Sequence, residues 1–165
     1  MLYNRYAESG RVQWGYKMGV HVDQANRKAW AELFAPTETG VILRSITTDF
    51  KFPMKWPDHI SIYHKLRHQP QEGDSAFVLD VLIMSELHQR PAARLIEDIV
   101  VYDYSRSKKI SMPDWMFSVF RDTFKLQEEA KATNSRRVHG LLQQVRELEL
   151  ASWDRHDAVE DLGGQ

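Results

Sequence analysis

The sequence contains no cysteine, and that absence removes several kinds of chemistry. Without thiols the chain has no disulfide framework, no thiolate metal site and no cysteine nucleophile. The sequence also lacks an apolar run long enough to span a bilayer, and its N-terminus has no hydrophobic signal segment. We therefore expect a cytoplasmic protein that is not embedded in a membrane.

A strong charge of one sign is also missing. The formal net charge is -1 over 165 residues, with 22 lysines and arginines against 23 aspartates and glutamates. Nucleic acids and anionic membrane surfaces select basic proteins, so we expect neither as a partner. Hydrophobic residues make up 42% of the chain and charged residues 27%, which is typical of a globular domain.

Several segments have the composition and alternation of β-strands. Short polar or proline-containing links separate them, which favours antiparallel neighbours. A fifth strand is predicted from Arg11 to Tyr16. The four clearest strand segments are 40–52, 59–67, 75–87 and 93–105.

Two helical regions are expected around this sheet. Asp23 is a suitable N-cap for a helix that continues through Phe34 and carries an apolar stripe containing Trp30. Ser111 and Pro113 begin a helical pattern that continues toward the C-terminus. The predicted fold class is α+β, with a sheet curled around one short helix in domain 1–110 and a helical extension in 111–165.

The N-terminal part of the chain has Val12 to Gly15, then His21 and Val22, then Trp30 and Glu32, and the four strand segments follow. This order resembles the hotdog-fold thioesterases, in particular the hydroxybenzoyl-CoA thioesterase-like branch found in many fungal genomes. The similarity implies a curved antiparallel sheet around a central helix, assembled as a homodimer or homotetramer by edge-to-edge pairing. It also implies an acyl-thioester substrate bound at the subunit interface, with coenzyme A as part of the substrate and no separate cofactor.

Thioester hydrolysis requires a carboxylate that attacks or activates water, and donors that stabilise the oxyanion. The family has its acid in the turn after the Trp-Gly pair, but the corresponding segment here, YKMGV, contains none. The replacement candidates are Asp23 and Glu32, and the resemblance gives His21 the role of polarising the thioester oxygen. Each has a simpler alternative: Asp23 as a plain helix cap, Glu32 as a solvated helix residue and His21 as a structural histidine.

The expected substrate-binding residues fall into two groups. Trp14, Gly15, Lys17 and Val22 surround the turn, where backbone amides starting at Val22 are expected to face a cleft. Lys65 and Arg67 share one face of a strand and could hold the phosphates of coenzyme A, although ordinary solvent exposure explains them equally well.

No metal site is expected from the histidines. His64 and His68 are four residues apart, but they lie on a predicted strand running into a loop, where helical ligand spacing does not apply.

The sequence thus favours an acyl-thioester hydrolase acting on an acyl-CoA or on a carrier-bound acyl or polyketide chain. Two alternatives remain open. One is a hotdog protein that binds an acyl or aromatic ligand without hydrolysis. The other is a hotdog fold that catalyses a lyase, dehydratase or cyclisation step.

Overall fold

The computed structural model describes residues 2–154 and 156–157. The chain divides into two compact units, residues 1–125 and 126–165. The first unit contains a β-sheet, the helices packed on it and the first turns of a long C-terminal helix. In the second unit, the described residues form the rest of that helix and a short turn.

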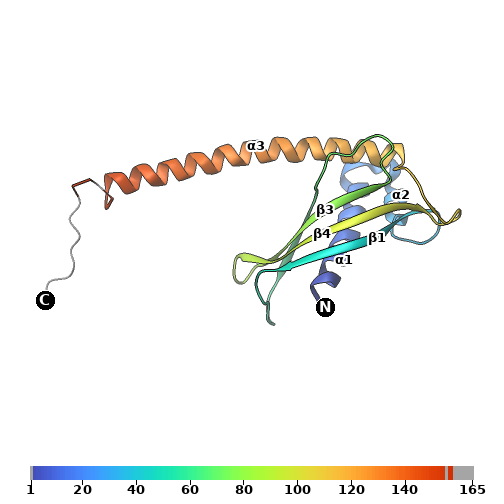
Figure 1. Cartoon of the computed structure of the whole chain (residues 1–165), viewed down its shortest axis with the longest axis horizontal. Helices are drawn as coiled ribbons and strands as arrows, with labels where there is room; N and C mark the ends of the chain where they lie inside the picture. The colour runs from blue at the N-terminus through green and yellow to red at the C-terminus, as the bar shows by residue number, and fades with distance from the viewer. Residues whose placement is uncertain (1, 155, 158–165) are drawn as a thin grey trace. The chain divides into compact units, whose positions relative to one another are not determined.

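The four predicted strands are confirmed, and they form an antiparallel sheet (Figure 1). The spatial order is β1-β4-β3-β2, and the short strand β5 (Lys108–Lys109) pairs with β4. Strands β1 and β2 are therefore the outer strands of the four. The bounds are β1 Thr39–Phe50, β2 Ile60–Leu66, β3 Ala76–Ser85 and β4 Arg90–Asp103.

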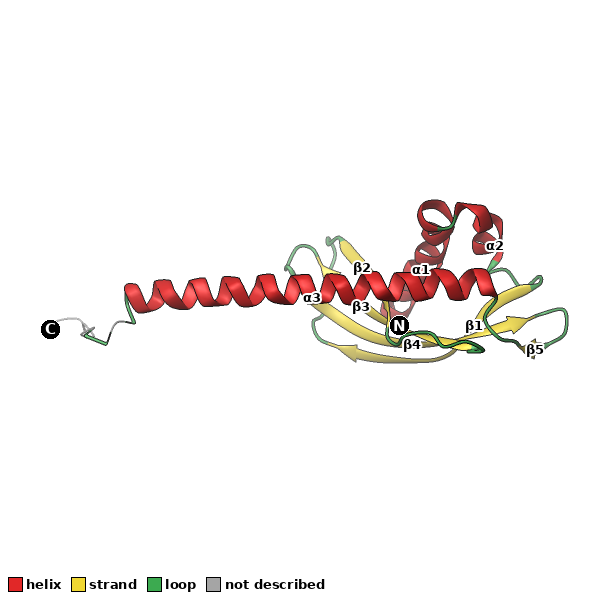
Figure 2. Ribbon diagram, turned by 90° about the horizontal axis from the view of Figure 1, so that it is seen from above, coloured by secondary structure: helices red, strands yellow, loops and turns green. Residues whose placement is uncertain are grey.

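The prediction of a fifth strand from Arg11 to Tyr16 is wrong, because this segment belongs to helix α1 (Leu2–Lys17). Figures 1 and 2 both place α1 and α2 on the same side of the sheet. Helix α1 crosses the strands: the Thr48 hydroxyl on β1 donates to Asn4, and Gly10 lies against Ile62 and His64 of β2. The helix covering the sheet is thus the N-terminal one, not the one expected from Asp23 to Phe34.

A short helical corner follows α1. It consists of a π-helical turn (Met18–Val22), a 3-10 turn (Gln24–Asn26) and α2 (Arg27–Glu32). The helix expected from Asp23 therefore begins four residues later. The predicted apolar stripe nevertheless faces the core at Trp30, which is fully buried.

The core of the first unit lies between the helices and the inner face of the sheet. The Trp30 ring packs edge-on against Trp115, with ring centroids 4.9 Å apart, and Phe120 packs against Trp14, Trp30 and Phe77. Trp115 and Phe120 belong to the first turns of α3 (Asp114–Ala151), which confirms the predicted C-terminal helix. Their aromatic side chains are packing residues.

Side chains along each strand alternate between the inner face of the sheet, which α1 covers, and its outer face. On β3 every second residue from Phe77 to Ser85 is buried, as expected for a strand with one covered face. Successive residues on β4 behave in the same way: Glu97 is fully buried on the inner face, whereas Asp98 lies on the outer face and pairs with Arg44. The sheet thus presents an outer face of polar and partly exposed residues.

The described part of the second unit has no buried side chain. Between residues 126 and 151 the helix keeps a row of exposed aliphatic side chains at three- and four-residue steps. They are Val138, Leu141, Leu142, Val145 and Leu148.

Candidate functional site

The structure places Trp14, Gly15 and Lys17 on the last turns of α1, not in a strand-to-helix turn. The Trp14 ring stacks on His64 with centroids 6.3 Å apart, so it is part of the packing between α1 and β2. At Gly15, an added Cβ would lie 2.5 Å from the Phe34 ring. Glycine is needed at this position because α1 and Phe34 approach so closely.

His21 and Val22 are exposed residues of the π-helical turn that directly continues α1. The amide of Asp23 donates to the Met18 carbonyl at 2.8 Å, which closes that turn. Val22 therefore belongs to a turn that continues α1, and its amide is not one of the unpaired amides of a helix start.

Asp23 has well-defined partners. Its carboxylate accepts hydrogen bonds from Asn26 Nδ2 at 3.0 and 3.1 Å and from the indole Nε1 of Trp30 at 3.0 Å. It makes no side-chain cap to the following helix. Asp23 thus satisfies the one polar atom of the buried Trp30 ring, which is a structural task.

Glu32 is the freer of the two candidate carboxylates. It lies at the end of α2, is exposed, and pairs with Lys28 at 3.7 Å. A pair this exposed contributes little to stability, so the Glu32 carboxylate remains available to solvent.

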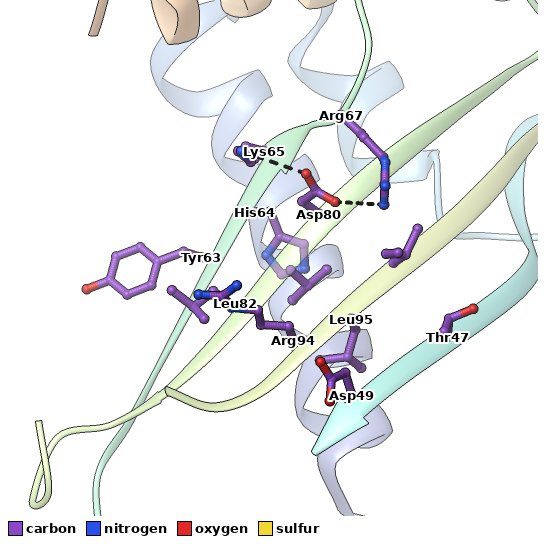
Figure 3. Close-up of a pocket in the computed structure, with 12 residues that line it drawn as sticks. Thr47, Asp49, Tyr63, His64, Lys65, Arg67, Asp80, Leu82, Arg94 and Leu95 are labelled. Atoms are coloured by element: carbon purple, nitrogen blue, oxygen red, sulfur yellow. Dashed lines mark hydrogen bonds and ion pairs between the residues drawn. The ribbon is translucent and has the colours of Figure 1, made fainter. Parts of the chain in front are cut away.

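Lys65 on β2 and Arg67, directly after that strand, lie together on the outer face of the sheet, where they line a hollow of about 570 Å³ (Figure 3). Both pair with Asp80 on β3, Lys65 Nζ at 3.7 Å and Arg67 at 3.2 Å. The hollow also extends over β4 and β1, where it includes Arg94, Ile96, Thr47 and Asp49.

The predicted site residues therefore divide into two groups. Lys65 and Arg67 point to the outer face of β2, whereas Trp14 packs on His64, which points to the inner face. The two predicted groups therefore lie on opposite faces of the sheet within a single protomer. Alternation along β2 separates them, because neighbouring side chains on a strand point to opposite faces.

A buried polar cluster under α1 was not predicted from the sequence. Arg11 Nη1 donates to Glu97 Oε1 at 2.5 Å, and the Glu97 side chain has no exposed surface. Glu97 Oε2 and His64 Nε2 are buried without a hydrogen-bond partner. The one signal in the sequence was a glutamate at an inward-facing position of the β4 pattern, but its partner lies 86 residues away.

Burial perturbs both titratable groups of this cluster. It lowers the pKa of His64 from 6.5 to about 4, and repulsion by the Arg11 cation acts in the same direction. Burial raises the pKa of Glu97, while the charge of Arg11 and its hydrogen bond oppose that rise. His64 is therefore neutral at physiological pH.

The sequence matches the model of the Thioesterase-like superfamily over residues 2–120, and the chain belongs to that family. Comparison with curated proteins gives no match. Solved structures share the fold at low sequence identity. A gentisyl-coenzyme A thioesterase is 16% identical, with 72% of this chain and 82% of that chain covered and a TM-score of 0.54.

Two further structures resemble the chain to a similar degree. A thioesterase from Thermus thermophilus, in complex with coenzyme A and Zn, is 14% identical, covers 74% of this chain and 77% of its own, and has a TM-score of 0.55. A 1,4-dihydroxy-2-naphthoyl-CoA thioesterase from Synechocystis is 15% identical, covers 73% and 82%, and has a TM-score of 0.53. Together they confirm the hotdog fold as an α+β architecture with an antiparallel sheet.

The described residues lack two further features. No helix among them is long and apolar enough to cross a membrane. No group of three or more histidine, aspartate or glutamate side chains in that part of the chain could hold a metal ion.

Proposed function

We propose that this protein hydrolyses acyl thioesters, with an acyl-CoA or a carrier-bound acyl chain as substrate. The observation that carries the proposal is the family match, which extends over residues 2–120. Two of the structures that share the fold are named as acyl-CoA thioesterases, and a third was solved with coenzyme A bound.

We assign the base to Glu32 in preference to Asp23. The Asp23 carboxylate already accepts hydrogen bonds from Asn26 and Trp30, whereas Glu32 has one weak partner and is open to water. A carboxylate in this position activates a water molecule, and the exposed ring of His21 donates a hydrogen bond to the thioester oxygen.

The test is release of free thiol from a panel of acyl-CoA esters that differ in chain length and aromaticity. Glu32→Gln should lower kcat by about 10²- to 10⁴-fold, the range for loss of a general base. His21→Gln should lower kcat by a smaller factor, and Glu72→Gln, at an exposed loop glutamate, is the matched control with wild-type rates. Wild-type kcat in Glu32→Gln would refute the assigned base, and no thiol release from any ester by the wild type would refute hydrolysis.

A second candidate function is binding of a thioester without hydrolysis. One observation favours it: the turn at Met18–Val22 continues α1, so the expected set of free amides for an oxyanion is not formed there. This function predicts that CoA esters raise the melting temperature of the protein without release of thiol. Thiol release in the same experiment would exclude it.

We also propose a homodimer that forms through the free edge of β1. This strand is 12 residues long, pairs with no described strand other than β4, and exposes Ile42, Leu43 and Phe50. An unpaired edge with exposed apolar side chains favours addition of another strand. Light scattering should give twice the chain mass for the wild type and a lower mass for Leu43→Lys. A wild-type monomer would refute the dimer.

A further inference from the structure

Helix α3 carries a row of aliphatic side chains that no part of the described chain covers. Val138, Leu141, Val145 and Leu148 follow one another at steps of three and four residues, so they lie along one side of the helix. Each of the four is at least 52% exposed, and Leu142 next to them is 61% exposed. We call the row of four the α3 seam. An apolar row on an exposed helix marks a contact with another surface, because its exposure to water is unfavourable.

The spacing of the α3 seam is that of a coiled coil. Its steps alternate between three and four residues, which places an apolar side chain about every 3.5 residues. The next positions of the same pattern are polar in both directions, with Asn134 before the seam and Ser152 after it. A helix that covers the seam therefore needs to be no longer than the segment 134–152 itself.

The α3 seam is complementary to itself. A second copy of the helix that runs antiparallel about the same midpoint pairs Val138 with Leu148 of the other chain. The same arrangement pairs Leu141 with Val145, so every layer contains one valine and one leucine. Leu142 lies beside the midpoint and meets Leu142 of the second copy. All five exposed aliphatic side chains are then covered by one partner.

The charges around the α3 seam are divided unequally along the helix. From residue 130 to residue 144 the charged residues are Lys131, Arg136 and Arg137, and none is acidic. From residue 145 to residue 154 there are three acidic residues and one arginine. Within the described part of the chain, Arg136 and Arg137 have no acidic partner and Glu147 has no basic one, since Glu147 accepts a hydrogen bond from the Gln143 amide.

This division of charge selects the orientation of a second copy. An antiparallel copy brings the basic half of each helix alongside the acidic half of the other, whereas a parallel copy brings like charges together. Arg137 and Glu147 flank the seam on the same side, so Arg137 of one chain lies close to Glu147 of the other in the antiparallel pair. A second copy thus supplies both the apolar spacing and the opposite charges that the seam requires.

We propose that the α3 seam binds the α3 seam of a second copy of this chain, in antiparallel orientation. The apolar layers supply the contact, and the unequal charges fix its direction. This interface goes beyond the proposed thioesterase activity, and it uses neither the helical corner nor the edge of β1. Because the α3 seam is short, we expect the pair to be reversible, and a covalent cross-link is the suitable way to trap it.

The absence of cysteine makes that experiment specific, because an introduced thiol is the only one in its chain. Full-length Val138→Cys and Leu148→Cys chains with different affinity tags are produced in the same cells, purified together and treated with a mild oxidant. The two positions are ten residues apart, or about 15 Å along the helix. A disulfide requires Cα atoms within about 7 Å, so an antiparallel pair joins one variant to the other and leaves each variant alone unlinked.

The matched control is Gln143→Cys in a single chain. Gln143 lies at the midpoint of the pair but is two residues from both Leu141 and Val145, so its side chain points away from the α3 seam. Its thiol should stay reduced. All the substituted positions are exposed, so equal melting temperatures are expected and will show that the variants are folded.

Two further substitutions test the apolar layers and the charges separately. Leu141→Lys in both cysteine-bearing chains should abolish the mixed disulfide. Arg137→Glu in both chains should slow its formation, and adding Glu147→Arg to the same chains should restore the rate, because the attraction is then reversed in sign but intact. Equal rates in the three charge variants would refute the antiparallel orientation.

Three outcomes of the cross-linking would overturn the interface. A disulfide that forms as readily within each variant alone as between the two would show parallel or random contact. Equal cross-linking of Gln143→Cys would show that the oxidant traps collisions. No mixed disulfide, with both thiols still free, would show that the α3 seam is not covered by a second copy.

Discussion

The most informative perturbation is removal of the Arg11 guanidinium from the buried pair with Glu97. In Arg11→Met the side chain keeps most of its length and its packing, but the Glu97 carboxylate loses the cation that now lies 2.5 Å away. The Glu97 side chain has no exposed surface and its second oxygen already has no partner, so water cannot replace the lost contact. The variant therefore leaves an uncompensated charge in the core.

The expected cost is about 3–5 kcal/mol, the range measured when one member of a buried ion pair is removed. That loss is a large fraction of the roughly 5–15 kcal/mol that stabilises a typical domain, so Arg11→Met should be close to unfolding at room temperature. Replacing both partners, as in Arg11→Met with Glu97→Leu, removes the buried charge altogether and should recover most of the loss.

The pH dependence of this effect follows from the Glu97 pKa. Burial raises that pKa in the wild type, and Arg11 opposes the rise, so Arg11→Met should raise it further. A carboxyl whose folded-state pKa is raised contributes stability that is present below its unfolded pKa and is lost as pH rises through the folded value. Arg11→Met should therefore be less destabilised at pH 5 than at pH 7.

The assay is urea unfolding followed by tryptophan fluorescence, because Trp30 lies in the core, Trp14 packs against it, and both report its exposure. The matched control is Lys28→Met, which removes the cation of the exposed Lys28–Glu32 pair and should cost at most about 0.5 kcal/mol. A loss below about 1 kcal/mol in Arg11→Met at pH 7, or a double variant no more stable than the single one, would refute the reasoning.

Three further predictions concern packing around the same helix. The pKa of His64 is lowered to about 4 in the folded state, so the wild type should lose at most about 3 kcal/mol of stability as pH falls from 6.5, the unfolded-state pKa, to about 4. His64→Phe should remove this loss. The free energy of unfolding measured against pH tests this, and parallel curves for the two proteins would contradict it. Gly15→Ala should lower the melting temperature, at a cost of about 1–3 kcal/mol, because the new methyl overlaps the Phe34 ring. Gly140→Ala has open space around the new methyl and should stabilise its helix by up to about 1 kcal/mol. Circular dichroism melting compares the two variants, and equal shifts in melting temperature would refute the packing argument. Asp23→Ala should lower stability by about 1–3 kcal/mol because the buried Trp30 indole loses its acceptor, and a thermal melt identical to the wild type would refute that role.

The sequence alone determined the sheet and the C-terminal helix. Alternation predicted the strands at 59–67 and 93–105, because a two-residue period shows which side chains point inward. Composition predicted the other two, since 40–52 is dense in β-branched residues and 75–87 is almost continuously apolar. The three- and four-residue spacing after Pro113 likewise identified α3, since an amphipathic pattern that is long enough distinguishes a helix from a strand.

Only the tertiary structure decided the secondary structure of the N-terminal part of the chain. Arg11 to Tyr16 is helical because α1 packs across the sheet, with Gly10 against Ile62 and His64, and short-range pattern does not record such contacts. The same holds for the candidate sites: Arg11 reaches Glu97 across 86 residues, and the hollow combines residues from four strands. Local sequence fixes which face a residue takes, but the distances between side chains remote in sequence depend on how the elements pack.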